Sequence, residues 1–152
     1  MEVSRIKPRP EDVPVGFEFR GEATGQSSGG FGRGSNQRAV YYWSAREHSK
    51  PIAIYVSEEG DGQSLAGTEG MSGTVVPVTD SLSGEYHDGM WILGRGPHER
   101  AISGGGFVHW DAGLAHSITS RVDGAVLAVR APIVVSVAEM SATLASMIQA
   151  AP

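Results

Sequence analysis

The sequence predicts an all-β domain, a jelly roll or a small β-barrel, that ends in one α-helix. Three observations predict this class. Short apolar runs are rich in β-branched and aromatic residues, 21 glycines are spread without a fixed period, and helical spacing of apolar residues appears only near the C-terminus. Glycines scattered between short apolar runs are typical of tight turns between many strands. The 152 residues suffice for one domain with a sizeable core.

The first 14 residues are polar and rich in proline, so we expect an extended arm over residues 1–14 and one domain over residues 15–152. Strands are expected where apolar and polar residues alternate or where β-branched and aromatic residues cluster. In chain order they cover residues 15–20, 38–45, 51–57, 73–79, 90–93, 107–110, 116–119 and 125–137, the last broken at Pro132. Loops or turns are expected at residues 25–36, 46–50, 58–63 and 94–100.

The C-terminal segment shows a helical pattern. Apolar residues recur at helical spacing at Val137, Met140, Leu144, Met147 and Ile148. Ser136 and Glu139 fit a capping box, in which a hydroxyl and a carboxylate each satisfy an unpaired backbone amide. The sequence therefore predicts an amphipathic helix over residues 137–149.

Charge and composition exclude several classes of partner. The net charge is -5 and the basic residues form no run, which disfavours nucleic acid. No cysteine is present, which excludes disulfides and thiolate metal sites. No apolar run reaches the roughly 20 residues of a membrane span, and no apolar leader is visible, so a cytoplasmic protein is expected. The glycine-rich segment Gly29–Ser35 lacks the Gly-Lys-Ser/Thr ending of a phosphate loop, so no nucleotide cofactor is expected.

The segment Gly104–His116, GGGFVHWDAGLAH, points most directly to a site. Glycines, a short aromatic run and a tight corner at residues 111–113 predict a β-hairpin that brings His116 onto the wall of a β-structure.

This segment resembles the second conserved motif of the cupins. Gly105, five residues, Asp111-Ala112-Gly113, two residues and then His116 follow the order of that motif, although Asp111 stands where proline is usual. Ser120 stands where asparagine is usual, and residues 123–132 are similar to the strand that follows the motif.

The first cupin motif is less complete. The run 91–93 is similar to the strand of this motif, and the residues before it can be aligned in two ways. One alignment puts Glu85 and His87 in the two histidine positions. The other puts Asp88 in the glutamate position and leaves Leu82 and Gly84 where the histidines belong. Both alignments remain open.

The resemblance implies a cupin-type β-jelly-roll barrel that works as a small-molecule enzyme and forms a homodimer. The implied cofactor is a divalent transition metal, Fe, Mn, Ni or Zn, held by His116, His87 and Glu85. His109 or Asp88 would move a proton, and the substrate, a small organic molecule, would lie among four aromatic side chains: Tyr42, Tyr55, Trp91 and Trp110. The reaction would be that of a dioxygenase, an isomerase or a lyase.

Each of these residues also has a plainer interpretation. His116 can lie in a cupin site that has lost its metal, Glu85 and His87 can belong to a polar turn, and the aromatic residues can simply pack in the core. His109 can be an ordinary strand residue, and His48 and His98 are expected in solvent. Two other functions therefore stay open: a metal-free cupin acting as an epimerase or polyketide cyclase, and a non-catalytic ligand-binding or sensor module.

Overall fold

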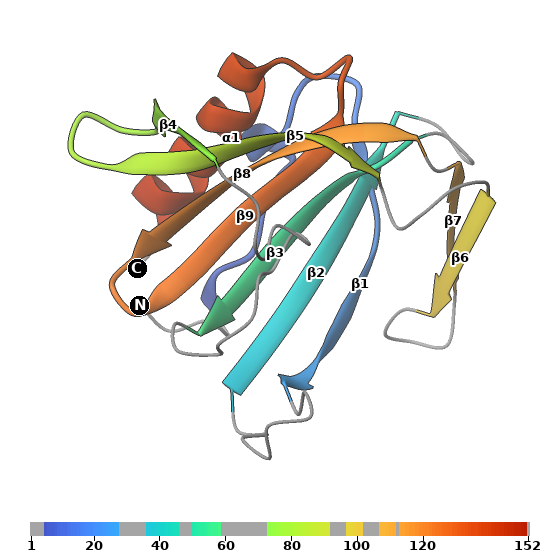
Figure 1. Cartoon of the computed structure of the whole chain (residues 1–152). Helices are drawn as coiled ribbons and strands as arrows, with labels where there is room; N and C mark the ends of the chain where they lie inside the picture. The colour runs from blue at the N-terminus through green and yellow to red at the C-terminus, as the bar shows by residue number, and fades with distance from the viewer. Residues whose placement is uncertain are drawn as a thin grey trace.

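A computed structural model describes residues 5–27, 36–45, 50–58, 73–91, 97–101, 107–111 and 113–151, with side chains for 5–23, 39–45, 50–58, 73–89 and 113–151. Its elements are shown in Figure 1. In chain order they are the 3-10 turn η2 (Pro10–Asp12), β1 (Glu18–Ser27), β2 (Asn36–Ser44), β3 (Ile52–Glu58), β4 (Thr74–Pro77), β5 (Ser83–Trp91), β6 (Pro97–Ala101), β7 (Phe107–Asp111), β8 (Leu114–Val122), β9 (Ala125–Pro132) and α1 (Val137–Ala150).

An antiparallel sheet of seven strands forms the body of the protein. Its strand order is β1-β2-β3-β9-β8-β5-β4, and β6 pairs with β7 in a separate two-stranded sheet. The prediction of an all-β domain with one C-terminal helix is confirmed. The closed jelly-roll barrel is not, because the described sheet ends at β1 on one side and at β4 on the other.

The last strand of the sequence lies in the middle of the large sheet, between β3 and β8. A two-residue turn joins β8 to β9, with φ of 46° at Asp123 and 81° at Gly124. Positive φ at both central residues is typical of the type I′ hairpin turn, which favours an Asp-Gly pair. This turn brings residues 125–132 back beside β3.

Several expected strands are confirmed, and three segments differ from expectation. The strands expected at 38–45, 51–57 and 107–110 agree closely with β2, β3 and β7. Residues 97–100, expected in a turn, belong to β6 (Pro97–Ala101), and β5 begins at Ser83 instead of at residue 90. The hairpin expected across residues 111–113 is not formed, because β7 pairs with β6 while β8 pairs with β5 and β9. The segments 29–35 and 59–63 and His48 lie outside the described residues.

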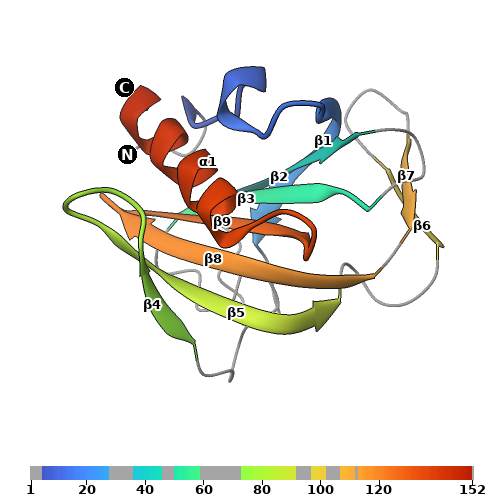
Figure 2. The ribbon, with the colours of Figure 1, turned by 90° about the horizontal axis from the view of Figure 1, so that it is seen from above.

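One face of the large sheet, here called the helix face, packs against α1. Its buried side chains include Ile54, Ile118, Leu127 and Val129, and they share one core cluster with the helix residues Met140, Leu144 and Met147. Figure 2 shows α1 and the N-terminal segment on this same side of the sheet. The helix begins as predicted: the Glu139 amide donates to the Ser136 hydroxyl at 3.0 Å, and the Ser136 amide donates to the Glu139 carboxylate at 3.0 Å.

The N-terminal segment packs onto the core. Ile6 and Val13 are buried in the core cluster. Asp12 accepts from the Arg9 guanidinium at 2.8 Å and also from the Ser146 hydroxyl on α1. Burial by itself would raise the pKa of Asp12, but the hydrogen bonds from Arg9 and Ser146 outweigh burial and lower this pKa.

Within the described ranges, no helix is both long enough and apolar enough to cross a membrane.

Candidate functional site

His116 lies on β8 and points to the helix face. Neighbouring residues of a strand point to opposite faces, so His116 shares a face with Ile118, a member of the core cluster. The side chain is 5% exposed. The histidine singled out by the sequence is therefore a buried residue of the helix face.

Both ring nitrogens of His116 have hydrogen-bond partners. Nε2 lies 2.6 Å from the Val135 carbonyl, which only accepts, so Nε2 carries the proton and donates. Nδ1 lies 2.9 Å from the Tyr86 hydroxyl, which can donate a hydrogen bond to it. Burial, and then the charge of Asp88, raise the pKa of Tyr86, which favours the protonated phenol as donor. His116 thus ties β5 and β8 to the connection between β9 and α1.

Glu85 and His87 lie on the other face, here called the polar face. They are two residues apart on β5, and the Glu85 Oε1 atom lies 2.9 Å from the His87 Nε2 atom. The His87 side chain is 2% exposed and the Glu85 side chain is 53% exposed. The imidazole is therefore buried behind a carboxylate that faces outward.

The structure brings Glu85 and His87 together but does not bring His116 to them. His87 pairs across the strands with Ser117, so the neighbouring His116 points through the opposite face. Among the residues that the structure describes, no group of three or more His, Cys, Asp or Glu side chains could hold a metal ion. The donor set implied by the cupin resemblance does not fit a metal here, because its members are separated by the sheet and both His116 nitrogens are engaged.

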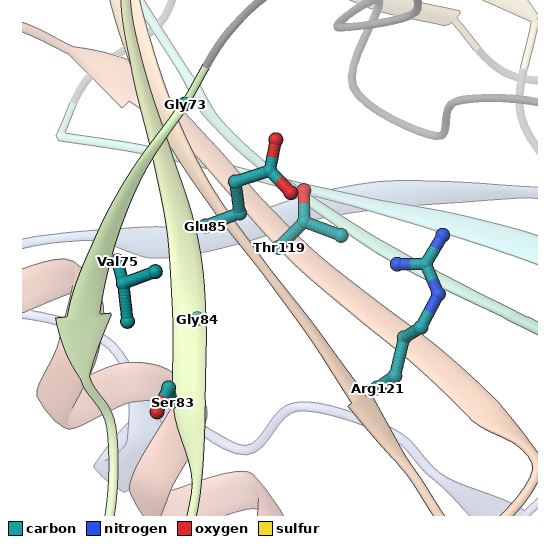
Figure 3. Close-up of a pocket in the computed structure, with 7 residues that line it drawn as sticks. All are labelled: Gly73, Val75, Ser83, Gly84, Glu85, Thr119 and Arg121. Carbon is teal, nitrogen blue, oxygen red and sulfur yellow. The ribbon is translucent and has the colours of Figure 1, made fainter.

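An open groove of about 580 Å³ lies on the polar face beside this pair. It is lined by Gly73, Val75, Ser83, Gly84, Glu85, Thr119 and Arg121. Figure 3 shows that Glu85, Thr119 and Arg121 project to the same side of β5 and β8. The groove therefore presents a carboxylate, a hydroxyl and a guanidinium next to one another.

Thr119 carries a polar atom that has no partner among the described residues. Its Oγ1 atom is buried and makes no hydrogen bond within the described part of the chain. Thr119 is the direct cross-strand partner of Glu85. A buried hydroxyl without a partner costs about 1–3 kcal/mol, a cost that a polar group of a bound molecule would remove.

Gly73 fixes the position of the Glu85–His87 pair. A Cβ atom at residue 73 would lie 2.7 Å from Glu85 Oε1 and 2.8 Å from His87 Cε1, closer than real contacts allow. The backbone just before β4 is thus packed against both side chains, and only glycine leaves them room.

Two of the other predicted site residues, Tyr42 and Tyr55, share the polar face with Glu85 and His87. Tyr42 and Tyr55 are buried on β2 and β3, whereas Asp88 is exposed on β5, where the pairing with β8 shifts register. His109 and Trp110 fall on β7 and Trp91 ends β5, but their side chains lie outside the description, as does that of His98 on β6.

Of the residues that line the groove, only Glu85 was predicted as a site residue, and Gly73, Thr119 and Arg121 are among those that were missed. Thr119 and Arg121 follow His116 by three and five residues, so their side chains lie on the face opposite to His116. The alternation of side chains along a strand was the one feature of the sequence that could have indicated their position. The approach of Gly73 to β5 had no local signal.

Comparison with protein-family models, curated proteins and solved structures gives no match. The resemblance to cupins therefore rests on the sequence motif alone.

Proposed function

We propose that the protein is an acid–base enzyme that binds a small organic molecule in the groove and transfers a proton through Glu85. The observation that carries this proposal is the Glu85–His87 contact of 2.9 Å beside the Thr119 hydroxyl, which has no hydrogen-bond partner in the described part of the chain. Carboxylate and imidazole groups are the side chains that most often move protons in enzymes.

The geometry supports distinct roles for the three residues. His87 holds Oε1 of Glu85, which leaves the second carboxylate oxygen for the substrate. Glu85 takes a proton from a carbon next to a carbonyl, so the C–H bond breaks, an O–H bond forms, and the electron pair moves onto the carbonyl oxygen. Thr119 donates a hydrogen bond to that oxygen as its negative charge develops. Return of the proton to the same or a neighbouring carbon completes an epimerisation or an isomerisation without any further reactant.

This proposal favours the metal-free reading of the cupin resemblance. The metal-dependent reading requires His116 in the same site as Glu85 and His87, and the sheet separates them. Membership of the cupins is itself a proposal, supported by the motif at residues 105–116.

Proton transfer can be tested before the natural substrate is known. The protein is incubated in D₂O with a panel of small ketones and 2-oxo acids, and loss of the proton next to the carbonyl is followed by ¹H NMR. We expect exchange with at least one compound, and a loss of about 100-fold or more in Glu85→Gln, in line with the usual contribution of a general base. Glu18→Gln, at a side chain that is 72% exposed on β1, is the matched control and should exchange as wild type does.

Two further variants separate positioning from catalysis. His87→Gln keeps the Glu85 carboxylate but removes the imidazole that holds its Oε1 atom. Exchange should therefore fall by about tenfold, less than in Glu85→Gln. Gly73→Ala should displace the pair and reduce exchange as well. If no panel member exchanges in wild type although some bind, the acid–base proposal fails and a ligand-binding module is favoured.

A further inference from the structure

The polar face continues beyond the groove as one cross-strand row. His87 pairs with Ser117, Ser117 with Arg130, Arg130 with Ala53, and Ala53 with Tyr42. The row crosses β5, β8, β9, β3 and β2 and is here called the polar row. Residues far apart in the sequence therefore meet on a single line of one face.

The polar row is enclosed, unlike an ordinary solvent-facing side of a sheet. Tyr42 and Ser117 are 0% exposed, His87 is 3% exposed, and Tyr55, in the neighbouring row, is 7% exposed. An antiparallel sheet usually buries one apolar face and leaves its polar face in water. Enclosing polar side chains costs free energy unless they are bonded, so the polar side chains of this face need hydrogen-bond partners.

Arg130 supplies a positive charge within this face. It is half-buried and hydrogen-bonded to Tyr55, which lies on the adjacent strand β3. Burial lowers the pKa of Arg130, and the interaction with Tyr55 opposes that change. A charge held away from water acts more strongly on a ligand and is screened less by salt than an exposed one.

The groove and the polar row are neighbours. On β8, Thr119 lies between Ser117 of the row and Arg121 of the groove, and Thr119 pairs with Ala128 on β9. Strand spacing and rise place the Glu85 and Arg130 α-carbons about 12 Å apart, with the short side chains of Thr119 and Ala128 between them. The long side chains of Glu85 and Arg130 cover part of this distance, so a molecule of a few carbon atoms can bridge the rest.

We propose that Arg130 and Tyr55 bind the carboxylate of a small organic acid whose reacting carbon lies at Glu85. The inference rests on the proposed function and adds its substrate class. One guanidinium carries one positive charge in a planar fork that matches a carboxylate. The phenol of Tyr55, bonded to this guanidinium, is the second group that can donate to the anion.

The test compares charged probes with neutral ones of the same shape. Propionate, pyruvate and benzoate are titrated into ¹⁵N-labelled protein alongside propionamide and benzamide, and backbone amide shifts give the Kd. We expect at least one carboxylate to bind ten times more tightly than its amide, with shifts along β8 and β9. Equal binding of acids and amides, or no binding by any acid, overturns the proposal.

Variants then test which arginine binds the carboxylate. Arg130→Met should weaken carboxylate binding at least tenfold, and Tyr55→Phe, which changes one atom and keeps the fold, about threefold or more. Arg20→Met makes the same change in charge on β1, where Arg20 bonds Ser44 outside the polar row, and should bind as wild type does. If Arg121→Met abolishes binding while Arg130→Met does not, the anion lies in the groove and the assignment is wrong.

Failure of this proposal can be distinguished from failure of the proposed function. Carboxylate binding that depends on Arg130, with no deuterium exchange in any compound, supports the anion site and contradicts the proposed acid–base function. Deuterium exchange at equal rates in neutral ketones and 2-oxo acids supports the acid–base function and contradicts the carboxylate site at Arg130.

Discussion

Replacing His116 by alanine tests whether this histidine is a structural residue or a metal ligand. The side chain is 5% exposed and joins Tyr86 to the Val135 carbonyl. We expect His116→Ala to lower the free energy of unfolding by about 3–5 kcal/mol, equally with and without a chelator.

The magnitude follows from three losses. Val135 lies in the core at 3% exposure, and its carbonyl without a donor costs about 1–3 kcal/mol. Tyr86 is only half-buried and can turn to water, so its lost hydrogen bond adds about 1 kcal/mol. The removed ring leaves a cavity beside Ile118 that adds about 1 kcal/mol or more. A domain of this size loses about 2–4 °C in Tm per kcal/mol, so Tm should fall by about 10 °C.

Urea and thermal unfolding in EDTA, and then with added Mn²⁺ or Zn²⁺, provide the measurement. Tyr86→Phe is the companion variant, because it removes only the hydroxyl and should cost about 1 kcal/mol. Two results would refute the reasoning: a His116→Ala protein as stable as wild type in EDTA, or a wild type that metal stabilises while His116→Ala is unaffected.

Three further predictions concern stability. Asp12→Ala should lower the free energy of unfolding at pH 7, because Asp12 accepts hydrogen bonds from Arg9 and from the Ser146 hydroxyl. Because the pKa of Asp12 is lowered by folding, this stabilisation is present above the unfolded value of about 3.9 and is lost as pH falls through the folded value, so urea curves of variant and wild type should converge in acid. A difference in stability between variant and wild type that does not narrow in acid contradicts this account. Ser136→Ala should cost about 1 kcal/mol by thermal unfolding, since the Glu139 amide loses its cap, and an unchanged Tm would count against the capping box. Leu144→Ala, at a helix residue that is 0% exposed, should cost about 3 kcal/mol, and a loss below 1 kcal/mol would place that helix face outside the core.

The polar face explains which strands the sequence predicted well. β3 is buried along most of its length, and its apolar, β-branched run predicts a strand directly. β5 reads as a polar turn because Glu85 and His87 alternate with Gly84 and Tyr86, and the two sets point to different faces. A strand whose enclosed face is polar carries little hydrophobic signal, so the start of β5 was missed.

The sequence by itself determined the features that depend on near neighbours along the chain. The helix predicted at residues 137–149, which spans Val137–Ala150 in the structure, and its Ser136 cap follow from local spacing and local hydrogen bonding. Only the tertiary structure decided on which face His116 lies, because a shift of one residue in strand register exchanges the two faces. Register depends on contacts between distant segments, and it is register that separates His116 from Glu85 and His87 and aligns His87 with Arg130.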